Sequence, residues 1–171
     1  DLRSPSAGAY EFNDTQLEGF EKQEKDLATI RAEKGRATGH YSRLMVEHVK
    51  KVLADSERVY PSYDASKGYE LAGFVWFQGW NDGRGNPDYA GQVAHLIRDL
   101  RRDLKVPGLP VVIGELGTDG PDAQGWIATF RAQQAEVASK PQFAGNVRLA
   151  RTAQFWPKVP DMSEQWKEFR A

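Results

Sequence analysis

The sequence predicts an α/β fold, namely a three-layer sandwich with helices on both faces of a mostly parallel central sheet. Three observations lead to this class. Short apolar runs typical of strands lie near residues 72–78, 109–114 and 146–152. Segments with helical periodicity alternate with these runs, and breaks rich in Gly, Pro and Asn separate the two kinds of segment. This alternation predicts that the three strands are parallel neighbours joined by right-handed crossovers.

The first 37 residues are predicted to be an irregular N-terminal segment with a charged helical insertion. Residues 1–20 show no periodicity, which indicates a loop or a linker. Residues 21–35 are dense in Glu, Lys and Asp, and they predict a solvated helix that ends at Gly35. An amphipathic helix follows at about 41–53, because its apolar residues recur at helical spacing.

The remaining elements alternate between strand and helix. The compact apolar run at 71–77 predicts a central parallel strand that is buried on both faces. A helix is predicted over 87–104, with Asn86 as its cap and Pro87 at its first position. After the strand at 109–114, apolar residues at helical spacing predict another helix over 123–138, which precedes the third strand.

Composition limits the classes of partner. The 171 residues are 40 % hydrophobic and 27 % charged, so we expect 1–171 to be a single domain or a fragment of one. A net charge of -1 argues against a nucleic-acid or anionic-membrane partner, and no apolar run approaches the roughly 20 residues of a membrane span. The chain has no Cys, and its three His residues lack metal-ligand spacing, so we expect no metal and no cofactor. Because it begins with Asp1, we expect the native N-terminus to be processed or to lie outside it.

Polar residues follow the first two central strands, where ligands bind in open α/β sheets. Gln78 and Asn81 come directly after the first strand, and Glu115 follows the second. We expect these three to cluster at the carboxyl edge of the sheet. The amides of Gln78 and Asn81 can donate hydrogen bonds to a developing oxyanion without titrating. Asn81, Asp82 and Gly83 can alternatively serve only to form a turn.

The three histidines differ in their predicted surroundings. His40 lies in a loop at a helix start and is the one expected to border a pocket, because loops carry function more often than other segments. His48 and His95 lie on predicted helices and are expected to be packing or surface residues. His95 lies off the apolar stripe, which predicts that it faces solvent.

The loop after the first strand carries a motif that resembles a known hydrolase family. Residues 73–83 read Gly-Phe-Val-Trp-Phe-Gln-Gly-Trp-Asn-Asp-Gly, residues 96–99 read Leu-Ile-Arg-Asp, and residues 109–115 read Leu-Pro-Val-Val-Ile-Gly-Glu. Over about residues 41–155 the chain is similar to the sialate O-acetylesterase-like carbohydrate esterases of the SGNH, or GDSL-like, hydrolase superfamily. The resemblance implies an SGNH-hydrolase or flavodoxin-like form of the predicted sandwich.

The resemblance also implies roles for individual residues. Gly79-Trp80-Asn81-Asp82 fits the superfamily's G-x-N-D block, whose Asn donates to the oxyanion. The Gln of the Trp-x-Gln-Gly stretch is implied to serve the oxyanion hole as well. The catalytic candidates are therefore Gln78 and Asn81, and which of them is the main donor stays open. The candidate residues of the substrate pocket are Gly79, Trp80, Asp82, Glu115 and His40. The implied substrate is an acetylated carbohydrate, and the implied location is extracytoplasmic, either periplasmic or secreted.

The chain departs from the family in two blocks. The family's nucleophile is a Ser in a Gly-x-Ser motif near its N-terminus, and its base is a His in an Asp-x-x-His motif near its C-terminus. No Ser of this chain follows a strand in such a motif, and no His has Asp three residues before it. The resemblance therefore implies the central portion of a hydrolase, incomplete at both ends and inactive alone, with flanking sequence or another polypeptide to supply the missing blocks.

Two other functions remain open from the sequence. The chain can be a non-catalytic, hydrolase-like structural or interaction subunit that lacks the nucleophile. It can also be a retaining glycoside hydrolase with Glu115 as the nucleophile and Asp82 as its partner. The latter ranks lower, because its two carboxylates must lie about 5–5.5 Å apart and a barrel typically needs about 250 residues.

Overall fold

The computed structural model describes residues 3–9, 11–157 and 166–170. The chain forms two compact units. Unit 1 consists of residues 1–71 and 91–107, and unit 2 consists of residues 72–90 and 108–171. The prediction that 1–171 forms one domain stays a prediction.

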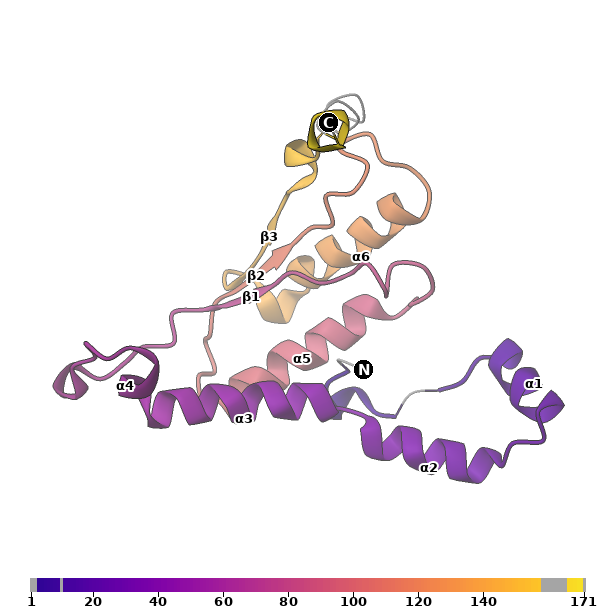
Figure 1. The fold of residues 1–171 in the computed structure, drawn as a ribbon, viewed down its shortest axis with the longest axis horizontal. Helices are drawn as coiled ribbons and strands as arrows, with labels where there is room; N and C mark the ends of the chain where they lie inside the picture. The colour runs from indigo at the N-terminus through magenta and orange to yellow at the C-terminus, as the bar shows by residue number, and fades with distance from the viewer. Residues whose placement is uncertain (1–2, 10, 158–165, 171) are drawn as a thin grey trace. The chain divides into compact units, whose positions relative to one another are not determined.

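Unit 2 contains a three-stranded parallel sheet in the order β1-β2-β3 (Figure 1). The strands are β1 (Phe74–Trp76), β2 (Val111–Gly114) and β3 (Val147–Ala150). Helix α6 (Trp126–Ser139) lies against β3 and buries the side chains of Phe130 and Val137. The predicted α/β class, with parallel neighbouring strands and flanking helices, is confirmed.

The predicted place of the first strand is wrong. Among the described strands β1 lies at the edge and β2 at the centre. Val75 of β1 is 70 % exposed and pairs with Val112 of β2, which is also exposed. Successive side chains of a strand point to opposite faces, so an apolar run predicts a strand without showing that both of its faces are covered.

The N-terminal helices of unit 1 differ from the prediction. Two helices, α1 (Asp14–Lys22) and α2 (Leu27–Ala37), replace the single helix expected over 21–35, and α1 lies partly in the segment expected to be a loop. Asn13 and Gln16 form a reciprocal capping box that starts α1, although this segment has no apolar period.

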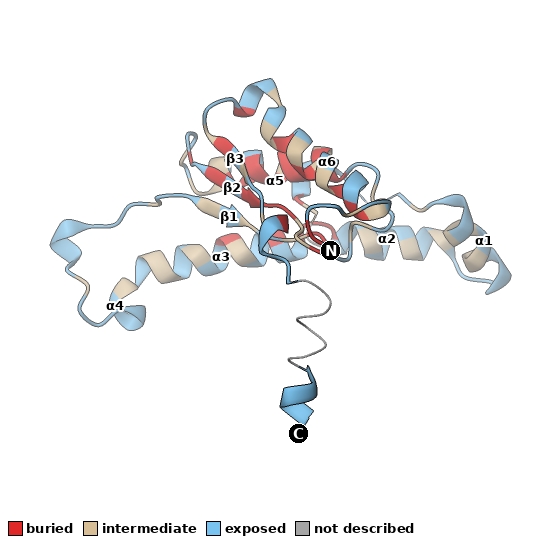
Figure 2. Ribbon diagram, turned by 90° about the horizontal axis from the view of Figure 1, so that it is seen from above, coloured by how far each residue is buried: buried red, intermediate tan, exposed pale blue. Residues whose placement is uncertain are grey.

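The break between these two helices has local causes. Glu24 has a positive φ of 51°, which is incompatible with a continuing helix. Asp26 then accepts a hydrogen bond of 2.9 Å from the backbone of Ala28 and caps α2. Neither α1 nor α2 contains a buried residue, as Figure 2 shows, in agreement with the solvated character predicted for 21–35.

The other helices agree with their predicted ranges. The amphipathic helix expected at 41–53 is α3 (His40–Ala54), and the short α4 (Ser56–Val59) follows it. The helix expected over 87–104 is α5 (Tyr89–Asp103), which starts in unit 2 and continues in unit 1. It begins at Tyr89 rather than at Pro87, because the side chain of Asn86 accepts from the backbone of Asp88 and closes a turn ahead of the helix.

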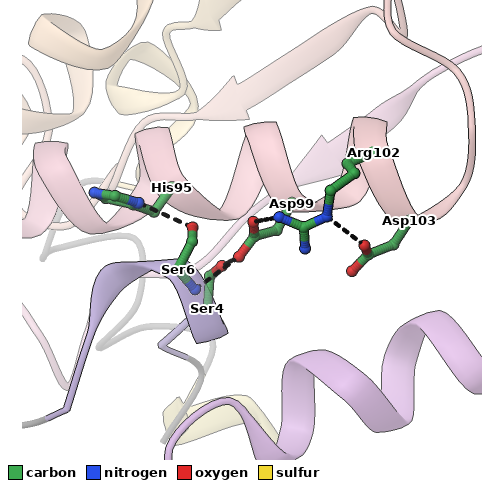
Figure 3. Close-up of polar contacts among 6 residues, drawn as sticks. All are labelled: Ser4, Ser6, His95, Asp99, Arg102 and Asp103. Carbon is green, nitrogen blue, oxygen red and sulfur yellow. Dashed lines mark hydrogen bonds and ion pairs between the residues drawn. The ribbon is translucent and has the colours of Figure 1, made fainter.

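A buried carboxylate fastens the N-terminal segment to α5 within unit 1 (Figure 3). Asp99 accepts hydrogen bonds from the hydroxyl of Ser4 and from the backbone nitrogen of Ser6, the latter at 3.0 Å. Arg102 approaches its other oxygen at 2.5 Å. Burial alone would raise the pKa of Asp99, but these hydrogen bonds outweigh burial and hold the pKa below its ordinary value.

Candidate functional site

A pocket opens at the carboxyl ends of β1 and β2, and all of it belongs to unit 2. Its volume is about 290 Å³. It is lined by Phe77, Gln78, Gly79, Trp80, Asn81, Gly114 and Leu116. The two loops meet here because parallel neighbouring strands end at the same edge of a sheet. The structure thus brings Gln78 and Asn81 to one pocket, whereas their catalytic role stays a prediction.

Asp82 holds the side-chain amide of Gln78. The Nε2 of Gln78 donates to Oδ2 of Asp82, and the Nδ2 of Asn86 donates to Oδ1 of the same carboxylate at 3.0 Å. A carboxylate only accepts, so the nitrogen of the Gln78 amide is the atom that faces Asp82. An amide nitrogen carries two hydrogens, and this bond uses one of them. The Oε1 atom of Gln78 is buried and has no partner among the described residues.

A buried tyrosine, Tyr89, forms a hydrogen bond with the backbone of Gln78. The hydroxyl of Tyr89 donates to the main-chain oxygen of Gln78 at 3.0 Å and accepts from Nε1 of Trp76, also at 3.0 Å. Burial raises the pKa of Tyr89 to about 12, although the hydrogen bond from Trp76 works in the opposite direction. The hydroxyl consequently stays protonated at neutral pH and keeps its role as a donor.

Gln134 joins the two loops that form the pocket. Its fully buried amide donates to the main-chain oxygens of Gln78 (3.3 Å) and Gly114 (3.2 Å). Its side-chain oxygen accepts from the backbone nitrogen of Leu116 at 2.8 Å. Sequence analysis missed this residue. The available signal was a glutamine on the apolar face of α6, at helical spacing from Phe130 and Val137.

The loop that lines the pocket packs closely against the ring of Phe130 at Gly79. A Cβ atom built on Gly79 would lie 2.2 Å from Cε1 of Phe130. Real atoms do not approach so closely, so the loop can pass over the ring of Phe130 only with glycine at this position. Gly79 lines the pocket, and its predicted role toward substrate stays a prediction.

Comparison with known proteins identifies the family. Residues 33–152 match the sequence model of a family described as carbohydrate esterase, sialic acid-specific acetylesterase. The chain belongs to this esterase family. The resemblance inferred from residues 73–83 and the segments that follow them is thus confirmed.

Two other comparisons cover curated proteins and solved structures. None of the curated proteins matches the chain. A solved structure of a protein from Arabidopsis thaliana matches with 23 % sequence identity, a TM-score of 0.47, and coverage of 73 % of this chain and 44 % of that one. The chain thus spans less than half the length of that protein.

The remaining predicted site residues lie in different places. Trp80 lines the pocket and is 53 % exposed, and Asn81 is exposed at the same pocket. Glu115 is buried and is not among the lining residues, although its neighbours Gly114 and Leu116 are. Its backbone oxygen accepts from Oγ1 of Thr152 at 2.6 Å. The predicted pocket role of Glu115 stays a prediction.

His40 belongs to unit 1, where it is the first residue of α3. Its predicted place at the border of the substrate pocket stays a prediction. Within the described ranges, no group of three or more His, Asp or Glu side chains is arranged to hold a metal ion. None of the helices in that part of the chain has the length and apolar character needed to span a bilayer.

Unit 1 contains a Ser–His pair that the sequence did not predict (Figure 3). Oγ of Ser6 lies 2.9 Å from Nδ1 of His95, which is half-buried rather than fully solvent-facing as predicted. In a catalytic triad a carboxylate orients the imidazole. The nearby carboxylate of Asp99 instead accepts from Ser4, the backbone of Ser6 and Arg102. The pair therefore serves to anchor the N-terminal segment to α5.

Proposed function

We propose that this chain forms the oxyanion-binding part of an O-acetylesterase that acts on a sugar or a polysaccharide. The observation that carries the proposal is that Gln78 and Asn81 line one pocket at the carboxyl edge of the sheet. Both side chains are uncharged amides, and the Gln78 amide has one hydrogen left after its bond to Asp82. Membership in the acetylesterase family supports the same reaction.

The proposed reaction is acyl transfer to a serine followed by hydrolysis. The Ser hydroxyl attacks the acetyl carbonyl carbon while His takes its proton, and the carbonyl π electrons move to the oxygen. The resulting oxyanion accepts hydrogen bonds from Gln78 and Asn81. The tetrahedral intermediate collapses, the sugar oxygen leaves with the proton from His, and water then releases acetate in the same manner.

The neutral charge of the two donors suits this role. A donor that does not titrate keeps its hydrogen bonds across the working pH range. The carboxylate of Asp82 lies close to the site, but its two oxygens already accept from Gln78 and Asn86. Asp82 thus acts as a positioning residue, because it fixes the plane of the Gln78 amide before substrate binds.

The nucleophile and the base are proposed to come from outside these 171 residues, because neither the Gly-x-Ser nor the Asp-x-x-His block occurs in them. Flanking sequence or another polypeptide would supply both. The same absence also supports the second candidate function, a hydrolase-like subunit without catalysis. The glycoside hydrolase alternative has less support, because its nucleophile candidate, Glu115, does not line the pocket. Family resemblance also supports a periplasmic or secreted location.

Acetate release tests the proposal. The 171-residue chain is incubated with an O-acetylated sugar, and free acetate is measured alongside a form of the enzyme that carries both catalytic blocks. We expect release only from the form with both blocks. If that form binds the acetylated sugar but releases no acetate, the non-catalytic subunit is the better description. Release by the 171-residue chain that is lost on Ser6→Ala or His95→Ala would place the nucleophile inside this chain and contradict the proposal.

A further inference from the structure

We infer that the exposed indole of Trp80 is the stacking platform for the sugar ring that bears the acetyl group. This inference rests on the proposed function and adds the position of the sugar to it. Trp80 lines the same pocket as Gln78 and Asn81, yet 53 % of it is exposed. Ligand pockets are typically lined by aromatic side chains together with a few polar groups that fix the ligand, and Trp80, Gln78 and Asn81 form such a lining. A pyranose ring has an apolar face of C–H groups that packs on such a surface.

The residues that line the pocket suggest where each part of the substrate lies. The pocket volume of about 290 Å³ is just below the range of about 300–1,000 Å³ typical of ligand pockets, so an extended carbohydrate does not fit inside it. Both amide donors, Gln78 and Asn81, line the pocket, so the acetyl group is placed beside them. The sugar ring is placed against the exposed surface of Trp80, which lines the same pocket.

Trp80 is held by two neighbours, so the platform is formed before the ligand arrives. The ring of Trp126 packs edge-to-face against Trp80, with centroids 5.6 Å apart and planes at 73°. The guanidinium of Arg84 lies 5.7 Å from the centroid of Trp80 and 5.1 Å from that of Trp126. A side chain held in place loses little entropy on binding, which favours affinity.

The turn that carries Trp80 packs against the indole of Trp126. The backbone nitrogen of Gly83 donates to the oxygen of Gly79 at 2.8 Å and closes the turn. A Cβ atom on Gly83 would lie 2.5 Å from Cζ3 of Trp126, so the indole occupies the space of the absent side chain. Arg84 comes next in the chain, and its guanidinium lies over the rings of both Trp80 and Trp126.

Binding by the 171-residue chain tests the inference. Two probes are titrated by NMR: a methyl glucoside monoacetate, which has a sugar ring, and ethyl acetate, which has none. Wild type is expected to bind the glucoside ester at least about tenfold more tightly than ethyl acetate. Trp80→Ala is expected to remove this preference, so that the variant binds the two probes with equal affinity, and Trp80→Phe is expected to retain most of the preference.

Trp166 provides a matched control. It is 56 % exposed, packs edge-to-face against Phe169 at 5.9 Å, and has the guanidinium of Arg170 5.8 Å from its ring. It does not line the pocket. Trp166→Ala is therefore expected to bind both probes as wild type does.

The outcomes separate this inference from the proposed function. If wild type binds both esters but Trp80→Ala keeps the preference for the glucoside, the platform is wrong and the acetyl site stands. Equal affinity of wild type for the two probes leads to the same conclusion. If wild type binds neither ester, the proposed acetyl pocket is wrong and the platform falls with it.

Discussion

The buried side-chain amide of Gln134 donates a hydrogen bond to the main-chain oxygen of Gln78 across 56 residues of sequence. Because the same amide also bonds to Gly114 and Leu116, one side chain ties together the loops after β1 and β2. These loops line the two sides of the candidate pocket. The backbone position of Gln78 therefore depends on a residue of α6 that does not line the pocket.

Gln134→Ala is expected to lower the free energy of unfolding by at least about 2 kcal/mol. The substitution leaves the oxygen of Gly114 and the nitrogen of Leu116 without this partner, and a buried polar group without a partner costs about 1–3 kcal/mol. Urea unfolding followed by tryptophan fluorescence measures the change. Glu136→Ala on the same helix is the control, since its exposed pair with Lys140 is worth only about 0–1 kcal/mol. Equal effects of the two substitutions would show that Gln134 is not a structural link.

Two glycines of one loop are expected to differ in how far alanine destabilises the fold. Gly79→Ala brings a methyl group into Phe130 and should destabilise the fold by about 1–3 kcal/mol. Gly85 has open space around its Cβ position, so Gly85→Ala should change stability by less than about 1 kcal/mol. Thermal unfolding of the two variants gives the comparison. A Gly79→Ala variant as stable as wild type would mean that this loop does not pack on Phe130.

Asp99 is expected to make stability depend on acid pH. Its pKa in the folded state lies below the unfolded value of about 3.9, so the ionised carboxylate stabilises the fold fully above that value. This stabilisation is lost as pH falls through the folded-state pKa. Asp99→Asn should therefore cost at least about 1.5 kcal/mol at pH 7, and this cost should decrease as the pH falls through the folded-state pKa.

Asp103→Asn is the control for this measurement. Asp103 pairs with the same arginine, Arg102, at 2.8 Å, but at an exposed site that is worth only about 0–1 kcal/mol. Urea unfolding at several pH values compares the two variants with wild type. A cost of Asp99→Asn that does not change with pH would show that the charge of Asp99 is not what secures Ser4 and Ser6.

Periodic elements of the fold could be predicted from sequence, and elements without a period could not. The helices α3, α5 and α6 agree with their predicted ranges because their apolar residues recur at helical spacing. Helix α1 was missed because only the caps Asn13 and Gln16 mark it. The edge position of β1 was missed because the exposure of Val75 depends on what covers the sheet, which is tertiary information.

The residues of the candidate site also differ in whether the sequence predicts them. Gln78 and Asn81 were found because they follow a strand within a short motif. Their supports were not found, because Gln134 and Tyr89 reach the site only after β1, β2 and α6 have packed. A hydrogen bond between distant residues leaves no periodic signal in a single sequence.

The rate of acetyl transfer with both amides removed shows whether this pocket binds the oxyanion. In an enzyme form that carries the Gly-x-Ser and Asp-x-x-His blocks, Gln78→Ala or Asn81→Ala should lower kcat by about 10²–10³ if that residue is the principal donor. One amide can partly replace the other, so the double variant is the decisive measurement. We predict that the double variant loses at least about 10³ in kcat with a small change in KM. A double variant with wild-type kcat would contradict an oxyanion role for this pocket.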